Sequence, residues 1–411
     1  MAFDVIVVGG GPAGASTAFQ LARRGVRVQL LERSRFPRPK PCAECLSPQA
    51  SRILGDMGAL AELEPGAAHL KGMLVRAPNG ITARGDYLAS PPHGFRGFRD
   101  RGLAVRREVL DDVLLRRARA RGVHVDHQAR VTDVLRDTRG RVVGVAVLRP
   151  GGEREELRSA FVVAADGLRS VVARRLRLAR TLTWPQRIAL VAHYRGVGGV
   201  SDYVEMHIER DGFVGIADVG DGVTTVAAVF PIRRAREISG NQAEFLRGWL
   251  ASKPHLAGRF SPATRDGDVV AVGPFASHAR HATNPGGGAL LVGDAADFYD
   301  PFTGEGIYAA LRGGEMAADT VVRALGVDAR RQASAMKDYE LARRREFAGK
   351  WRVERLIGMG VALAPVANRA VRALAANKPL ADLLVGVTGD FVPAHRVLRA
   401  DYLARLLVLP C

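Results

Sequence analysis

Cysteine is scarce in this sequence, with only Cys42, Cys45 and Cys411 among 411 residues. The chain also opens without a basic leader or cleavage site, because its first six residues run directly into a hydrophobic strand. Both features predict a cytoplasmic protein. Cys42 and Cys45 have no further Cys or His at ligand spacing, so they do not complete a closed zinc site and no metal site is expected. A working disulfide between them is an alternative that the spacing leaves open.

Long apolar runs are also missing. The longest candidate, residues 356–367, contains Gly358, Gly360 and Pro365 and falls short of the roughly 18 residues that cross a bilayer. No membrane-spanning helix is therefore predicted. A peripheral membrane contact stays open for the last helices, which combine arginines with apolar residues, although packing on the rest of the protein is the commoner use of such a face.

Lysine is rare as well: only six of the 60 basic residues are lysines, yet the formal net charge is +18. A nucleic-acid-binding protein would cluster its basic residues or interleave them with aromatics. Here the arginines are scattered along the chain, so we predict no nucleic-acid partner. The excess charge would at most attract phosphate-bearing cofactors or an anionic surface over long range.

What the sequence does contain is the composition of a packed globular enzyme, with 47% hydrophobic and 25% charged residues. A chain of this length exceeds one hydrophobic core, so more than one domain is expected. Apolar runs at 4–8 and 26–31 flank a glycine-rich turn and a helical segment at 13–24. This order predicts a strand, a helix and a second, parallel strand. A further helix is expected at 105–121.

The pattern changes between about residues 181 and 272, where short alternating strands are separated by Asp-Gly turns. We predict an α/β fold: a Rossmann-like dinucleotide-binding domain, an inserted antiparallel β-sheet substrate domain and a helical C-terminus. The predicted boundaries are 1–75, 101–180 and 273–330 for the first, 76–100 and 181–272 for the second, and 331–411 for the third.

The glycine-rich turn carries the fingerprint of a dinucleotide site. In Gly9-Gly10-Gly11-Pro12-Ala13-Gly14, Gly9 allows the tight turn, Gly11 lets the backbone approach a pyrophosphate, and Gly14 lets the helix pack on the strand. The phosphates would lie at the helix N-terminus. Glu32 follows at the end of the second strand, where its carboxylate can bind ribose hydroxyls and disfavours a 2′-phosphate. NADP is therefore not expected at this site.

Two later segments resemble motifs of flavoprotein monooxygenases of the para-hydroxybenzoate hydroxylase type and of geranylgeranyl reductases. They are Ala164-Ala165-Asp166-Gly167-Leu168-Arg169-Ser170 and Leu290-Leu291-Val292-Gly293-Asp294-Ala295-Ala296. The resemblance implies that the dinucleotide is FAD, that Asp294 bonds its ribityl chain, and that Arg106 contacts the flavin. Asp166 could instead be a turn residue that ends a strand.

Two further segments resemble the geranylgeranyl reductase branch. One is the loop 300–307, whose glycines would let main-chain amides approach the flavin ring while the next helix directs its positive end at it. The other is 35–48, although Ala43 replaces a common Gly. Cys42 is expected to pack beside the flavin or substrate. The expected cofactor contacts are Gly9, Gly11, Pro12, Ala13, Gly14, Glu32, Arg33, Arg106, Asp166, Gly293, Asp294, Pro301, Gly304, Gly306 and Ile307, with Cys42 and Phe213 in the substrate pocket.

The resemblance implies an FAD-dependent oxidoreductase, and its reaction has three candidates. The first is a monooxygenase that hydroxylates or epoxidises a lipophilic or aromatic secondary metabolite through a flavin C4a-hydroperoxide. The second is reduction of C=C bonds in a prenyl or lipid chain. It ranks lower because residues 212–217 replace the Trp-x-Phe-Pro motif usual in the reductases. The third is a non-catalytic electron-transfer flavoprotein. A halogenase is disfavoured, since the Trp-x-Trp-x-x-Ile-Pro motif is missing.

The electron donor and the catalytic groups are less defined. Because the chain has one glycine fingerprint, NAD(P)H would bind only transiently. No catalytic residue is predicted. His207 would act as a base only if its face of the strand 203–208 lined the cavity; instead that face is expected in solvent and the Val204 face at the core or pocket. The sequence does not predict the oligomeric state.

Overall fold

The computed structural model describes residues 3–181, 184–275 and 277–408, so Cys411 lies outside the described residues. Within them, the central parallel sheet has five strands in the order β20-β12-β1-β2-β8. They are β1 (Val5–Val8), β2 (Val28–Glu32), β8 (His124–His127), β12 (Phe161–Ala164) and β20 (Ala289–Leu291). Strands β1, β2, β12 and β20 are buried throughout, as expected for parallel strands covered on both faces.

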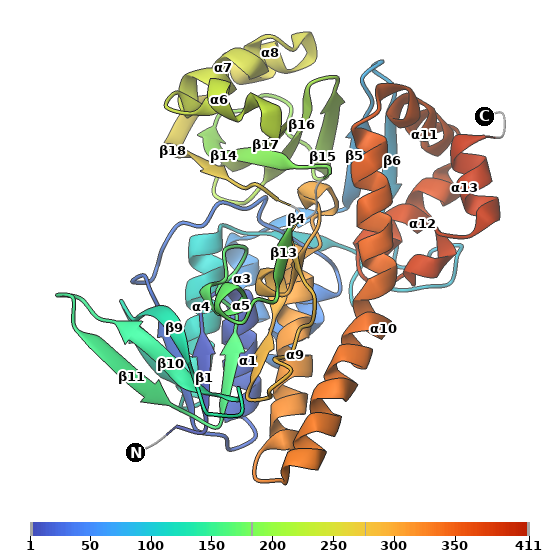
Figure 1. Ribbon diagram of the computed structural model, residues 1–411. Helices are drawn as coiled ribbons and strands as arrows, with labels where there is room; N and C mark the ends of the chain where they lie inside the picture. Colours follow the sequence, from blue (N-terminus) through green and yellow to red (C-terminus); the bar gives the residue numbers. More distant parts are fainter. Residues whose placement is uncertain (1–2, 182–183, 276, 409–411) are drawn as a thin grey trace.

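Helices and a small sheet enclose this parallel sheet. Helix α1 (Pro12–Ala22) packs against both α4 (Arg107–Ala120) and α9 (Gly306–Ala324). The antiparallel sheet of β9 (Arg130–Arg136), β10 (Val142–Leu148) and β11 (Arg154–Arg158) packs through β10 on β12. Figure 1 shows this sheet beside β1 and near the N-terminus. The predicted strands at 4–8 and 26–31 and helices at 13–24 and 105–121 are confirmed, with ends shifted by one or two residues.

The second large sheet lies above the first in Figure 1 and has the order β18-β14-β17-β16-β15-β5-β6. Its strands are β5 (Gly72–Arg76), β6 (Thr82–Asp86), β14 (Arg187–Arg195), β15 (Val204–Glu209), β16 (Gly212–Asp218), β17 (Val223–Pro231) and β18 (Thr264–Val272). The sheet is antiparallel as predicted except for one pair, since β5 and β15 run parallel. The first of its strands starts at Gly72, slightly before the predicted boundary at residue 76.

The two faces of this sheet have different roles because side chains alternate along each strand. On the outer face, Val214, Val226 and Ala228 pack with Trp249 and Leu256. The last two belong to α7 (Gln242–Ala251) and α8 (Pro254–Phe260), which cover that face in Figure 1. The inner face is directed toward the parallel sheet.

Helices form the C-terminal part of the described chain, as predicted. Helix α10 (Ala329–Val361) runs beside α9 and continues to the second sheet (Figure 1). Helices α11 (Ala364–Ala376) and α12 (Lys378–Thr388) pack on β6, and α13 (Ala400–Leu407) packs on α11. Within the described residues, no helix combines the length and the apolar character that crossing a bilayer requires.

Short elements connect these layers. The helices and 3-10 turns are α2 (Ala50–Asp56), α3 (Leu60–Leu63), η1 (Glu64–Gly66), α5 (Val171–Arg175), η2 (Ile232–Arg234), α6 (Ala235–Ile238), η3 (Gly293–Ala295), η4 (Pro301–Thr303) and η5 (Ala394–Arg396). The strands are β3 (Cys45–Leu46), β4 (Ala68–Leu70), β7 (Gly102–Ala104), β13 (Ala179–Thr181), β19 (Ser277–Ala279) and β21 (Asp297–Phe298).

Candidate functional site

The turn between β1 and α1 contains glycines that serve different purposes. Gly9 has a φ of +102°, and a Cβ there would lie 2.5 Å from the carbonyl oxygen of Ala165. A Cβ on Gly14 would lie 1.8 Å from the Gly9 carbonyl oxygen, so Gly14 lets α1 pack on the turn. At Gly11, by contrast, the nearest described atom to an added Cβ is Arg107 Nη2, 3.9 Å away. The described protein atoms do not require a glycine at position 11, and the space in front of it belongs to a cavity.

The N-terminus of α1 and the end of β2 border the same cavity. No side chain caps the N-terminus of α1, which leaves a site of the kind that favours phosphate. Glu32 is 4% exposed and lines the cavity. Its Oε2 accepts the amide of Gly10 at 2.7 Å and its Oε1 accepts the amide of Ser34 at 2.9 Å. These two bonds fix the carboxylate, whose remaining lone pairs can accept ribose hydroxyls.

At the start of α4 the cavity is lined by Arg107 and not by the expected Arg106. Arg106 is the N-cap residue, and its side chain pairs with Glu108 at 2.9 Å and with Asp266 at 3.7 Å. Arg107 begins the helix and points to the other side, where Asp111 holds its guanidinium through two hydrogen bonds of 2.8 Å. The change in backbone conformation between cap and helix separates the two side chains.

The segment after β2 supplies a second wall of the cavity, including Lys40, Cys42 and Glu44. Cys42 and Cys45 are both free thiols in this structure. The Cys42 thiol lies beside the Arg107 guanidinium and accepts the amide of Glu44 at 3.3 Å. Cys42 thus lies where the sequence placed it, on the cavity wall.

Asp166 has a local structural role in addition to its place on the cavity wall. Its Oδ2 accepts the amides of Val171 at 2.7 Å and Val172 at 3.4 Å, at the start of α5. Its Oδ1 is buried without a hydrogen-bond partner among the described residues. Burial raises the pKa of Asp166, while Ser170 and the Val171 amide oppose this shift. Asp166 can therefore hold the turn with Oδ2 and still bind a cofactor with Oδ1.

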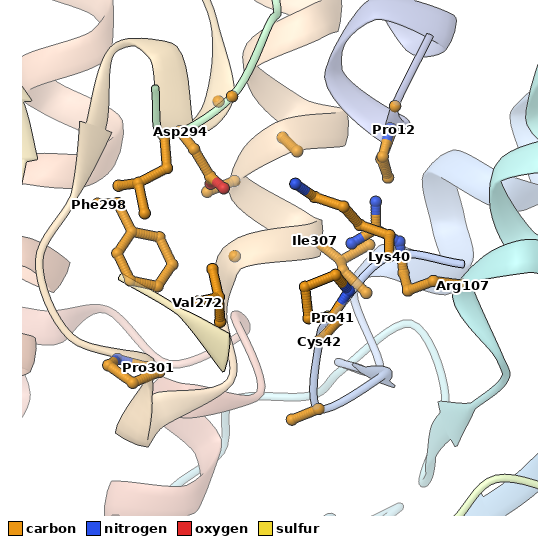
Figure 2. A pocket seen from close by; sticks show the side chains of 18 of the residues that line it. Pro12, Lys40, Pro41, Cys42, Arg107, Val272, Asp294, Phe298, Pro301 and Ile307 are labelled. Atoms are coloured by element: carbon orange, nitrogen blue, oxygen red, sulfur yellow. The ribbon is translucent and has the colours of Figure 1, made fainter. Parts of the chain in front are cut away.

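Asp294 and Lys40 face one another from opposite walls of the cavity. Figure 2 shows their side chains pointing toward one another in the space bordered by Pro12, Arg107 and Ile307. Burial raises the pKa of Asp294, with Lys40 and then Arg107 opposing that shift. Burial likewise lowers the pKa of Lys40, and Asp294 opposes it. The pair can therefore present both an acceptor and a positive charge to a polar cofactor.

The loop before α9 forms the floor of the cavity. Asp300 Oδ1 accepts the amide of Phe302 at 3.1 Å, and Gly304 has a φ of +73°. Pro301, Gly304, Gly306 and Ile307 all line the cavity, as does Gly293 from η3. The 19-residue helix α9 begins here, so its positive end is directed at this part of the cavity.

These walls enclose one cavity of about 700 Å³ that continues to the inner face of the second sheet. Phe213 of β16 lies in it and meets Phe302 edge-to-face, with ring centroids 5.1 Å apart. The sheet contributes an apolar wall: Ala189, Val191, Val204, Met206, Phe213, Ala227, Val229 and Val272. A second side is aromatic: Phe275, Phe298, Tyr299, Phe347 and Trp351.

His207 is not positioned as a base for this cavity. Val204 and Met206 line it, as predicted, whereas His207 and Glu205 are on the outer face of the sheet. That face is not in solvent as expected: His207 is 5% exposed, stacks on His255 of α8, and lies 3.0 Å from Glu205. Helix α8 covers both residues, and Arg259 from α8 pairs with Glu205 at 2.6 Å.

Of the predicted site residues, all but Gly14 and Arg106 line the cavity. Sequence reasoning missed Arg107, Lys40, Glu44 and Glu305. Arg107 carried a signal as the neighbour of the predicted Arg106, and Lys40, Glu44 and Glu305 lie in segments that resemble family motifs. Only the folded chain shows that Glu44 and Glu305 are buried in the cavity wall.

FAD fits the residues of this cavity. Gly11 leaves room that no described protein atom fills, the α1 N-terminus lacks a side-chain cap, and Glu32 is held at the end of β2. These are the positions for the pyrophosphate and the adenosine ribose of a dinucleotide. The cavity then extends past Asp294 and the loop 300–307, leaving space for the flavin beside the apolar wall.

Comparison with known proteins agrees with this assignment. The FAD binding domain family model matches residues 2–348. Two digeranylgeranylglycerophospholipid reductases of Methanopyrus kandleri are similar: reductase 1 is 31% identical, over 84% of this chain and 87% of its own. Reductase 2 is 29% identical, over 95% and 94%. A flavin-dependent brominase shares the fold, with a TM-score of 0.80 and 22% identity over 95% of this chain and 94% of that one. The chain therefore belongs to the FAD binding domain family and is an FAD-dependent oxidoreductase.

Proposed function

We propose that the protein reduces isolated C=C bonds in the hydrocarbon chain of a lipid-type substrate. This proposal depends on the apolar wall, which the second sheet places in the same cavity as the dinucleotide-binding residues Gly11 and Glu32. A substrate without polar groups near its reacting bond is held by such a surface, and the surface excludes water from the reaction. The similarity to two reductases that act on digeranylgeranylglycerophospholipid supports this choice.

In this proposal the chain's residues hold and orient while FAD carries the electrons. The turn at Gly11, Glu32 and the Lys40–Asp294 pair would bind the cofactor. When bound, FAD supplies two-electron chemistry as hydride transfer. Phe213, Met206 and Val229 would position the substrate chain.

The test is an anaerobic reaction of dithionite-reduced holoenzyme with a phospholipid that carries geranylgeranyl chains. We expect the flavin to return to its oxidised spectrum at the same rate as hydrogenated lipid appears by mass spectrometry. Reduced flavin that stays reduced in the presence of several prenyl lipids would contradict the proposal.

Monooxygenation of an aromatic compound is the second candidate, and the aromatic side of the cavity favours it. Phe275 and Phe298 have ring centroids 5.1 Å apart, and Tyr299 and Trp351 have centroids 5.9 Å apart. Such rings can stack on a planar substrate. Oxygen consumption distinguishes the candidates: a monooxygenase takes up oxygen in proportion to hydroxylated or epoxidised product, whereas the reductase works without oxygen.

The electron donor in either reaction is proposed to be NAD(P)H that binds transiently. The sequence contains one glycine fingerprint, at residues 9–14, and FAD would occupy it. A nicotinamide would therefore have to bind elsewhere and briefly. Stopped-flow reduction of the bound flavin by NADH and by NADPH tests this. Bound flavin that neither nicotinamide reduces would contradict a nicotinamide donor.

A lipid substrate would also bring the protein to a membrane surface. Exposed apolar side chains on and between the C-terminal helices support a peripheral contact, with Leu356 44%, Leu363 51% and Leu407 42% exposed. Cosedimentation with anionic phospholipid vesicles tests it. Replacing the three leucines by serine should abolish binding if they insert into the membrane surface.

A further inference from the structure

Glu354 places a carboxyl beside the aromatic side of the cavity. Helix α10 turns one stripe of residues inward, spaced by three or four positions: Phe347, Trp351, Glu354 and Gly358. The first three line the cavity. An added Cβ on Gly358 would lie 2.8 Å from Asp300 Oδ2, in the loop that forms the cavity floor. Glu354 therefore faces the cavity between its aromatic side and its floor.

The Glu354 carboxyl is accessible but has no partner. Glu354 is half-buried, whereas Arg352, Arg355 and Leu356 on other sides of α10 are exposed. Among the described residues, none hydrogen-bonds or forms an ion pair with its side chain, yet its oxygens are not enclosed by protein atoms as those of Glu305 are. The carboxyl thus presents unused hydrogen-bonding capacity to the cavity.

The buried cations near Glu354 are already matched by other carboxylates. They form two ion pairs, Lys350–Asp390 and Arg343–Asp297. Glu305 adds a further carboxyl to the same region. A phosphate or carboxylate group bound beside Glu354 would therefore meet like charge, with both of these cations already paired. The site disfavours an anionic group and suits a neutral or cationic hydrogen-bond donor.

The protonation state of Glu354 distinguishes these two kinds of donor. Burial first, and then Glu305, raise the pKa of Glu354 well above its usual value, while Lys350 opposes the shift. A protonated carboxyl donates one hydrogen bond and accepts another, which matches a hydroxyl, whereas an ammonium requires the ionised form. The same cavity continues to the apolar wall of the second sheet, which suits hydrocarbon. A hydrocarbon chain that bears a hydroxyl fits both surfaces.

We propose that Glu354 binds a hydroxyl group of the substrate, so that the substrate of this cavity is a long-chain unsaturated alcohol. This inference rests on the reductase activity proposed above. The hydroxyl would exchange hydrogen bonds with the Glu354 carboxyl, and the hydrocarbon would lie against the apolar wall. The hydroxyl then determines which double bond reaches the flavin, because a chain held at one end cannot slide along the wall.

The first experiment measures binding and needs no turnover. Oxidised FAD holoenzyme is titrated with geranylgeraniol, with its methyl ether and with geranylgeranylamine, and the flavin difference spectrum reports binding. The wild type should bind the alcohol about tenfold more tightly than the ether, because only the alcohol can donate a hydrogen bond. Equal affinities for the alcohol and the ether, or tighter binding of the amine, would overturn the proposal.

Variants test whether this preference belongs to Glu354. Glu354→Leu should bind the alcohol and the ether equally, whereas Glu354→Gln should keep most of the preference, since an amide also donates and accepts. Asp338→Leu makes the same kind of change at an exposed position of α10 and should keep the wild-type preference. Each variant is first matched to the wild type in FAD content and circular dichroism. A preference that persists in Glu354→Leu would show that another residue binds the hydroxyl, and the assignment to Glu354 would be wrong.

Reduction of the alcohol separates this proposal from the reductase activity. Dithionite-reduced holoenzyme is mixed anaerobically with geranylgeraniol, and mass spectrometry identifies which double bonds are reduced. We expect one position to dominate in the wild type and in Asp338→Leu, and a mixture of positions in Glu354→Leu. If the alcohol binds through Glu354 but no double bond is reduced, the reductase activity is wrong and the hydroxyl site stands without a role in it. If double bonds are reduced but the alcohol and the ether bind alike, the reductase stands and the hydroxyl site is wrong.

Discussion

Glu44 Oε2 lies 2.7 Å from His193 Nε2, while Glu44 Oε1 accepts the amide of Arg107 at 2.8 Å. One carboxylate thus connects the segment after β2, strand β14 of the second sheet and the start of α4. Glu44 has a φ of +63°, a left-handed conformation that is uncommon for a residue other than glycine. The two hydrogen bonds hold this strained residue in the cavity wall, where the two large sheets meet.

Removing this connection should destabilise the protein. Glu44→Ala loses both hydrogen bonds and keeps the strained backbone, so we expect the free energy of unfolding to fall by roughly 2–4 kcal/mol. Glu44→Gly should recover about 1 kcal/mol of that loss, because glycine adopts a positive φ without strain. Urea unfolding measures both values, with the exposed Glu153→Ala as the control. Equal stability of the Ala and Gly variants would show that the backbone at position 44 stores no strain.

The glycines at positions 11 and 14 should respond differently to the same change. A Cβ at Gly11 enters the cavity, so Gly11→Ala should leave the unfolding free energy of the apoprotein unchanged and lower FAD affinity by at least about tenfold. A Cβ at Gly14 collides with the Gly9 backbone, so Gly14→Ala should cost on the order of 3 kcal/mol or more. Thermal unfolding and fluorescence titration with FAD measure the two effects. Equal FAD affinity of Gly11→Ala and the wild type would show that FAD does not bind against Gly11.

The parts of the site that could be predicted from the sequence are those built from residues that are close together along the chain. Gly9, Gly14 and Glu32 follow from a single strand, turn, helix and strand, and their order in the sequence determines their places. The choice between Arg106 and Arg107 depended on which residue begins α4, and element ends are the least certain part of such a prediction.

The other parts of the site could not be predicted, because they depend on contacts between segments that are far apart in the sequence. The charged groups that act on Glu305, Lys350 and Asp390, lie about 45 and 85 residues further along the chain, and Tyr87 lies far before it. Nothing near Glu305 in the sequence therefore indicates its burial. The position of His207 depended on α8, a helix almost 50 residues later that covers the outer face of the sheet. Alternation along β15 correctly separated its two faces, but it did not show that a helix covers the outer one.

Lys40 and Asp294 should contribute jointly to FAD binding. Lys40→Met and Asp294→Asn should each weaken FAD binding by about 10- to 100-fold, because each removes a charge that faces the cavity beside its partner. The double variant should lose less than the product of the two effects, since each side chain is the strongest opposite charge acting on the other. Flavin fluorescence titration of the four proteins completes the cycle. Strictly multiplicative losses would show that the two residues act independently.

Glu305 should make stability depend on pH. Its pKa is about 8 in the folded protein and 4.5 in an unfolded chain. Between these values the folded state keeps a proton that the unfolded state has lost, so the free energy of unfolding falls as the pH rises through this window and is level above it. Glu305→Gln should remove this part of the loss, which is on the order of 2–5 kcal/mol. Urea unfolding at pH 5 and pH 9 measures it, and a Glu153→Gln control at an exposed position should keep the wild-type difference.

Adjacent alanines on β17 separate the substrate wall from the core. Ala227 lines the cavity, whereas Ala228 is fully buried on the outer face beneath α7 and α8. Ala227→Phe should therefore fold and bind FAD like the wild type but raise KM for a lipid substrate or abolish turnover, because the ring occupies substrate space. Ala228→Phe overfills a packed core and should lower the unfolding free energy by about 1–3 kcal/mol or more. Steady-state kinetics and urea unfolding measure the pair. Normal turnover in Ala227→Phe would mean that the substrate does not lie against β17, and the apolar wall would then lose its place in the proposed reaction.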